Sequence, residues 1–131
     1  LFIEGHPIVW EGPVSNWIRA CDHILAMDVE AVVPGHGPIT TLDGVRQLKG
    51  YLEYLTIEAR KRFDAGMKAY DAACDIALDA YASWKDRERI VVNVDTLYRD
   101  FRGKAAKPHA VKLFGDMARY HASQSATHAR S

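Results

Sequence analysis

The chain of 131 residues is 48% hydrophobic and 26% charged, which are the proportions of a folded globular domain and not of a disordered or fibrous segment. Seventeen Lys and Arg residues balance seventeen Asp and Glu residues, so no net field would attract nucleic acid or an anionic membrane. No apolar run approaches the ~18 residues of a membrane span. We therefore expect a soluble protein, with the cytoplasm as the favoured compartment and with neither nucleic acid nor a membrane as a partner.

The amino-terminal region alternates between strand and helix patterns. Leu1 to Ile3 predicts the end of a buried strand, and the turn formers that follow break it. From Ser15 a helix is predicted by apolar residues at steps of three and four, namely Trp17, Ile18, Cys21, Ile24 and Leu25. The continuously apolar run 31–33 predicts a second strand, covered on both faces. We therefore predict an α/β fold with about two short parallel strands, and a loop at residues 34–38 where open sheets tend to build their sites.

The rest of the chain predicts helices. A long one is expected over residues 45–63, ending near Gly66, because Val45, Leu48, Leu52, Leu55 and Ala59 recur at helical spacing. Further helices are expected over 67–82, 90–101 and 111–121. The small polar residues 123–131 predict a frayed tail. We accordingly divide the chain into an amino-terminal part (1–40), a helical region (41–122) and the tail (123–131).

Histidine and cysteine spacing does not predict a self-contained metal site. The six histidines include no H-x-H or H-x-x-x-H pair, which are the spacings of local metal sites. Cys21 and Cys74 lack C-x-x-C spacing and are predicted to be small core residues. For His6, the turn position favours a structural or solvent-facing role over a place at the mouth of a cleft.

His36 differs from the other histidines because glycines flank it and prolines flank the glycines. The glycines let the backbone bend, and the prolines stiffen the ends of the loop. An imidazole in such a loop can point into a cleft. Spacing alone nevertheless favours an exposed loop histidine over a ligand.

The segment Ala31-Val32-Val33-Pro34-Gly35-His36-Gly37-Pro38-Ile39 resembles the late VVPGHGPV segment of the metallo-β-lactamase-fold hydrolases. The residues before it are similar to what lies between that family's metal-bridging aspartate and its PGHG loop. The long helix with Tyr51 and Leu52, followed by Trp84, Val92-Asn93-Val94 and Tyr98-Arg99, resembles the helical carboxyl-terminal extension of one branch. The likeness covers most of the chain and is strongest over residues 1–40.

This resemblance implies that residues 1–40 are the carboxyl-terminal half of an αββα metallo-β-lactamase sandwich. It also implies that His36 is a ligand to the second of two metal ions, usually zinc. In the complete hydrolase, metal-bound hydroxide would attack an ester, thioester or related bond of a small-molecule substrate.

The chain departs from the family in lacking the H-x-H-x-D-H motif, the third histidine of the first site and the bridging aspartate. A catalytic zinc takes about three protein ligands, so we expect this chain alone to hold metal weakly or not at all, to contain no catalytic residue and to be inactive. The opening Leu1-Phe2-Ile3 predicts a chain that begins inside a strand, with the missing amino-terminal half of its own fold as its partner.

A second hypothesis is a helical docking or oligomerisation module without catalysis. Its basis is the long amphipathic helix predicted over 45–63, although hardly three heptads are present and packing within its own domain is the commoner outcome. Both hypotheses predict association, as a homodimer or as an aggregate, because a half-sandwich would expose apolar surface.

Overall fold

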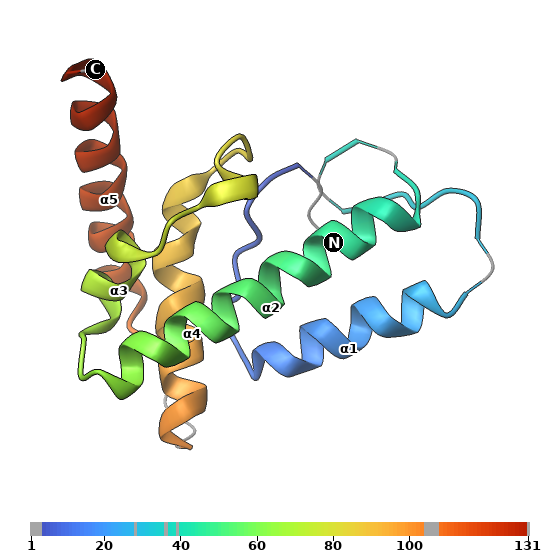
Figure 1. Ribbon diagram of the computed structural model, residues 1–131, viewed down its shortest axis with the longest axis horizontal. Coiled ribbons are helices and arrows are strands. Elements are labelled where there is room, and N and C mark those ends of the chain that lie inside the picture. Colours follow the sequence, from blue (N-terminus) through green and yellow to red (C-terminus); the bar gives the residue numbers. More distant parts are fainter. Residues whose placement is uncertain (1–3, 28, 36, 39, 104–107, 131) are drawn as a thin grey trace.

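The computed structural model describes residues 4–27, 29–35, 37–38, 40–103 and 108–130, with the side chains of 125–130 left aside. The helices are α1 (Val14–Leu25), α2 (Leu42–Asp64), α3 (Ala69–Asp75), α4 (Ile90–Arg102) and α5 (Ala110–Arg130), with single 3-10 turns at η1 (Asp79–Tyr81) and η2 (Arg87–Arg89). Helices α1 and α2 lie side by side and antiparallel, α4 crosses α2, and α5 returns beside α4 (Figure 1).

The predicted α/β fold is wrong. The protein is 67% helical, and no strand occurs in the part of the chain that the structure describes. Where a parallel strand was predicted at 31–33, Val32 makes one antiparallel bridge with Thr40, and Val33 is 77% exposed. A β-strand is stable only beside a partner strand, and among the described residues the apolar run has one paired position. The other predicted strand, 1–3, lies outside the described residues.

Helix α2 forms the centre of the core, as its apolar spacing predicts. Its apolar face is buried to within 1% exposure, through Val45, Leu48, Tyr51, Leu52, Leu55 and Ala59. Burying one such leucine side chain contributes about 1.5–3 kcal/mol, so these residues dominate the stability of the helix. This face packs inside the domain, so it is not available to a partner helix.

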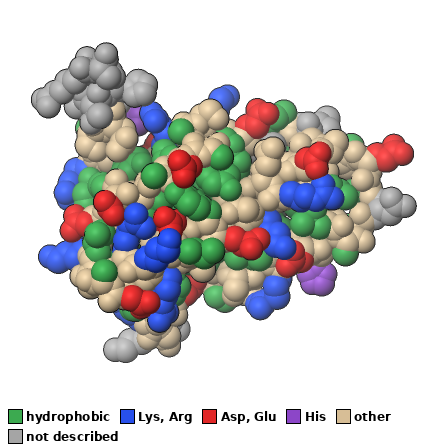
Figure 2. Space-filling model, in the orientation of Figure 1, with side chains coloured by type: hydrophobic (Ala, Val, Ile, Leu, Met, Phe, Trp, Pro, Cys, Tyr) green, Lys and Arg blue, Asp and Glu red, His purple; other side chains and the backbone are tan. Residues whose placement is uncertain are grey.

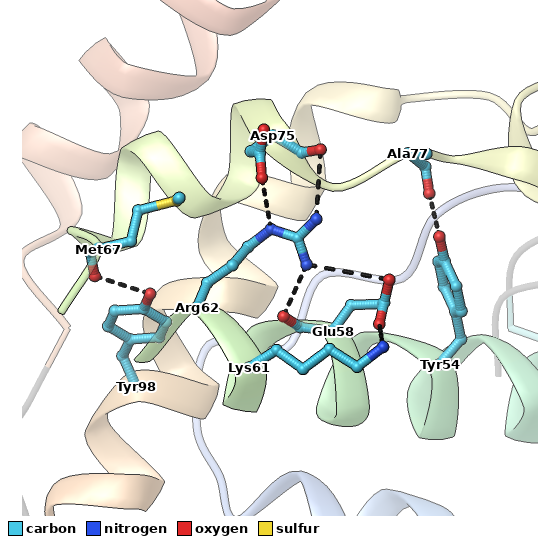
Figure 3. Close-up of polar contacts among 8 residues, drawn as sticks. All are labelled: Tyr54, Glu58, Lys61, Arg62, Met67, Asp75, Ala77 and Tyr98. Carbon is cyan, nitrogen blue, oxygen red and sulfur yellow. Dashed lines mark hydrogen bonds and ion pairs between the residues drawn. The ribbon is translucent and has the colours of Figure 1, made fainter. Parts of the chain in front are cut away.

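Helix α3 is shorter than the helix predicted over 67–82. Ile76 is extended (φ −67°, ψ 121°), and Asp79 has the left-handed φ of +50°. Arg62 of α2 holds the end of α3, because its Nε donates to the Asp75 carboxylate at 2.9 Å (Figure 3). Within α2, the Arg62 Nη1 donates to the Glu58 carbonyl at 2.8 Å. Tertiary contacts thus end a helix that local periodicity would have continued.

Acidic and basic side chains lie interspersed over the face shown in Figure 2. Several of them pair within one helix, as Arg60 does with Asp64 at 3.1 Å and Lys61 with Glu58 at 2.7 Å. Among the helices of the described residues, none combines the length and the apolar run that a membrane crossing requires. Helix α5 runs on to Arg130, through most of the segment predicted as a tail.

Candidate functional site

The loop between α1 and α2 is closed by backbone hydrogen bonds. The Val32 amide donates to the Thr40 carbonyl at 2.6 Å, and the Thr40 amide donates to the Val32 carbonyl at 2.9 Å. Gly37, inside the closed loop, has a φ of +102°, which glycine adopts without steric cost. The PGHGP motif therefore occupies a loop whose two ends are joined, while His36 itself lies outside the described residues.

The start of α2 holds the end of this loop. Thr41 caps the helix, with its side-chain oxygen accepting from the Asp43 amide at 3.3 Å. Gly44 packs directly on Thr40, because a Cβ at that position would lie 2.5 Å from the threonine Oγ1. Only glycine fits this approach without a shift of Thr40, whose backbone also closes the loop.

An ion pair fixes α1 against α2 at the base of the loop. Lys49 Nζ lies 2.6 Å from the Asp22 carboxylate. The hydrogen bond that Lys49 donates to the Asp22 carboxylate raises the pKa of the ammonium, so the lysine stays charged at neutral pH. The contact joins the last turns of α1 to the first half of α2.

The described residues do not by themselves fit a metal centre. No three of their His, Cys, Asp and Glu side chains come together as a ligand group, whereas a catalytic zinc takes about three protein ligands. A hollow of about 200 Å³ beside the loop is lined by Val29, Thr41, Leu42, Asp43 and Arg46. Its one carboxylate already pairs with the Arg46 guanidinium at 2.5 Å.

Histidines 23, 109 and 121 and the two cysteines differ in their exposure. His23, on the last turn of α1, and His109, before α5, are exposed, and His121 lies 3.8 Å from Glu88. Cys21 is buried as predicted, and burial raises the pKa of its thiol. Cys74 is exposed, so its predicted core position is wrong.

His6 has a structural position: its side chain is fully buried. Its Nδ1 lies 2.8 Å from the Tyr51 hydroxyl, and its Nε2 lies 3.2 Å from the Tyr81 carbonyl oxygen. A carbonyl only accepts, so Nε2 carries the proton and Nδ1 accepts from the tyrosine. The rings of Tyr51 and Trp84 stand edge-on to the imidazole, at centroid distances of 5.0 and 6.0 Å.

Burial also determines the charge of this histidine. Desolvation lowers the pKa of His6 to about 4, against a contribution from the Tyr81 carbonyl that raises it. The imidazole is therefore neutral at pH 7. Desolvation likewise raises the pKa of the Tyr51 hydroxyl, which therefore remains a hydrogen-bond donor. With both ring nitrogens bonded inside the core, His6 is not available as a metal ligand.

Residues 5–10, here called the N-terminal strap, lie extended along α4 (Figure 1). Asn93 carries the largest share of the attachment: its Oδ1 accepts from the Val9 amide at 2.8 Å, and its Nδ2 donates to the Pro7 carbonyl at 2.8 Å and to the Tyr51 hydroxyl at 3.1 Å. Polar side chains of α4 and η2 thus replace the backbone partners that a β-sheet would supply.

Three further side chains continue this row along the strap. Arg89 donates to the His6 carbonyl at 3.1 Å, Thr96 donates to the Val9 carbonyl, and Arg99 donates to the Trp10 carbonyl at 3.0 Å. Asp100 lies one helical turn after Thr96 and accepts from the Val14 amide at 2.9 Å, so that a side chain of α4 caps the start of α1. Together these bonds hold the strap and the start of α1 on one face of α4.

Sequence reasoning missed this polar row. Its signal is nevertheless present, because the polar positions 89, 93, 96 and 100 recur at steps of four and three, and Asn93 lies between valines. A buried polar side chain needs partners, so an asparagine between valines predicts a bonded neighbour. The pattern could not say which segment that neighbour is, since the partners lie more than 80 residues away in the sequence.

No family model, curated protein or solved structure matches this chain.

Proposed function

We propose that this chain is part of a metal-dependent hydrolase of the metallo-β-lactamase superfamily, which cleaves an ester, thioester or related bond, and that His36 binds one of its metal ions, expected to be zinc. The observation that carries the proposal is the PGHGP motif in a loop closed by Val32 and Thr40. The proposal depends on the motif and this loop, and not on the predicted parallel strands, which are wrong.

The closed loop supports a ligand role because metal sites need ligands held on fixed backbone. The two hydrogen bonds at its base and the close packing of Gly44 on Thr40 restrict the loop at both ends. The described residues supply no complete ligand group. In the proposed hydrolase, the other metal ligands would come from further parts of the protein. No catalytic residue is assigned within this chain.

The test replaces His36 with alanine in the full-length hydrolase. Two-metal hydrolases bind about two metal ions per site, and we expect bound zinc to fall to about one and hydrolysis of generic esters and thioesters to fall by about 100-fold or more. Metal content is measured by elemental analysis and activity by steady-state rates. The exposed His109 gives the matched control, since His109→Ala should change neither value. If His36→Ala retains the zinc content and the hydrolysis rate of the unaltered protein, His36 is not a metal ligand.

The second candidate function is association without catalysis, and α5 favours it. This helix buries Leu113, Met117 and Tyr120 against the body, whereas Val111 is 82% exposed and Phe114 is 59% exposed. Phe114 also lies 5.4 Å from the Trp10 ring, so the apolar surface continues onto the strap. An apolar surface that water contacts promotes association, and α5 thereby replaces the long helix α2 as the face for a second copy.

For this candidate, the double variant Val111→Ser/Phe114→Ser should convert a dimer of the chain into a monomer without loss of helical signal. Light scattering behind size exclusion measures the mass, and circular dichroism measures the helices. Ile57→Ser, at an exposed position of α2, is the matched control and should leave the dimer intact. A wild-type chain that is monomeric at high concentration, or a double variant that still dimerises, would remove α5 from the interface.

A further inference from the structure

We propose that the N-terminal strap is released from α4 by acid, with His6 as the group that responds, while the helices remain folded. The release uncovers the aromatic rings that the strap covers and the polar row of α4. The strap is suited to this because side chains, and not a backbone ladder, supply most of its hydrogen bonds.

The hydrogen-bond directions around His6 fit only the neutral ring. Asn93 donates to the Tyr51 oxygen, and the Tyr51 hydroxyl donates to His6 Nδ1, whose Nε2–H donates to the Tyr81 carbonyl. A proton added to Nδ1 would point at a hydroxyl that needs Nδ1 as its acceptor. Either the tyrosine proton or the new imidazole proton would then lack a partner in a buried site, which is costly.

The charged groups that face His6 do not, on balance, stabilise its protonated ring. Arg87 and Arg89 of η2 disfavour the imidazolium, and Asp86 favours it more weakly than Arg87 disfavours it. Tyr51 of α2, Tyr81 of η1 and Tyr120 of α5 all have pKa values raised by desolvation and stay neutral. The other charged neighbours are peripheral: Glu4 and Lys85 are exposed, and Glu88 lies 3.8 Å from His121.

The strap adds Val9 to the buried core, and His6 and Pro7 are buried as well, but the helices also pack directly on one another. Leu48, Leu52 and Leu55 of α2 belong to the same buried core as Ala72 and Ala73 of α3 and the apolar residues of α4. Besides its side-chain partners, the strap has one backbone bridge, between Gly5 and Lys85. A segment of six residues can open with less free energy than the whole domain.

The sign of the pH dependence follows from the two states of His6. A released histidine has the ordinary pKa of about 6.5 and binds a proton more readily than the attached one, whose pKa is about 4. The attached state is therefore fully favoured above about pH 6.5 and loses its advantage as the pH falls toward 4. The opening equilibrium should rise by up to about tenfold per pH unit in this window, and by about 300-fold between neutral pH and a pH well below 4.

The experiment is amide hydrogen exchange on the whole chain between pH 6.5 and 4, corrected for the intrinsic pH dependence of exchange. We expect the Val9 amide, bonded to Asn93, to exchange up to about tenfold faster per unit of falling pH, while amides of α2 and the helical circular dichroism stay constant. His6→Gln, whose amide can both accept and donate, should remove the slope. His23→Gln, at an exposed position, should retain it.

Two results would overturn the proposal: a pH-independent exchange of Val9, or loss of helical signal together with the strap. If His6→Gln does not fold, the NMR titration of the His6 ring in the wild-type chain decides instead. A ring that titrates near pH 4 in the attached state supports release by protonation. A ring that titrates near 6.5 contradicts it.

Discussion

Replacing Leu55 with alanine is expected to lower the free energy of unfolding by about 2–5 kcal/mol. Leu55 is 1% exposed at the middle of the buried face of α2, so the shortened side chain leaves a cavity that its neighbours fill only in part. Since small domains are stable by only about 5–15 kcal/mol, this change consumes a large share of the total. Urea denaturation followed by circular dichroism measures it.

Ile57, two residues along the same helix and 58% exposed, provides the matched control. Ile57→Ala should change the free energy of unfolding by about 0.5 kcal/mol or less, as surface substitutions usually do. Equal effects at the two positions would contradict the placement of the buried face of α2. Polar replacements at Leu48, Leu52 and Leu55 would for the same reason unfold the chain, so they cannot test an interface.

The second large effect is expected from Asn93→Leu. The leucine has the same branched shape but leaves the Val9 amide, the Pro7 carbonyl and a buried tyrosine hydroxyl with one partner fewer each. An unsatisfied buried polar group costs about 1–3 kcal/mol, so we expect a loss of about 3 kcal/mol or more in the free energy of unfolding. Amide exchange at Val9 should also accelerate, because its acceptor is gone.

Thr96→Val tests whether Asn93 and its neighbour hold the strap as one unit. This nearly isosteric change removes the donor to the Val9 carbonyl. If both side chains hold the same segment, the double variant should lose less than the two single losses combined, because the first change already loosens the strap. Strict additivity would show that the two bonds act independently. Gln47→Leu, at an exposed position of α2, is the control for adding a leucine and should be nearly neutral.

The local pattern predicted the helices best where an apolar stripe is long. The spacing of Val45, Leu48, Leu52, Leu55 and Ala59 predicted both α2 and its buried face, and the helix over 90–101 is confirmed as α4. The stop of α3 was missed, because the extended Ile76 and the Arg62 contacts with Asp75 come from packing. Periodicity reports which face a helix can bury but not where another element interrupts it.

The sequence likewise predicts one part of the candidate site, whereas the other part depends on tertiary contacts. The residues of the PGHGP loop can be identified in the sequence, but its closure depends on Val32 and Thr40, and the predicted strand beside it is wrong. From its turn position alone, His6 was predicted to be either structural or solvent-facing. Its buried, neutral state depends on Tyr51 and Tyr81, which lie 45 and 75 residues away in the sequence.

The sequence by itself determined the apolar stripes of the long helices, the absence of a net charge and the one motif on which a function can be proposed. Only the tertiary structure decided that residues 5–10 lie extended on α4 as a strap held by side chains. The physical reason is that an extended segment must find partners for its backbone groups. Here those partners are Asn93, Thr96 and Arg99, whose positions beside the strap depend on the folding of the whole chain.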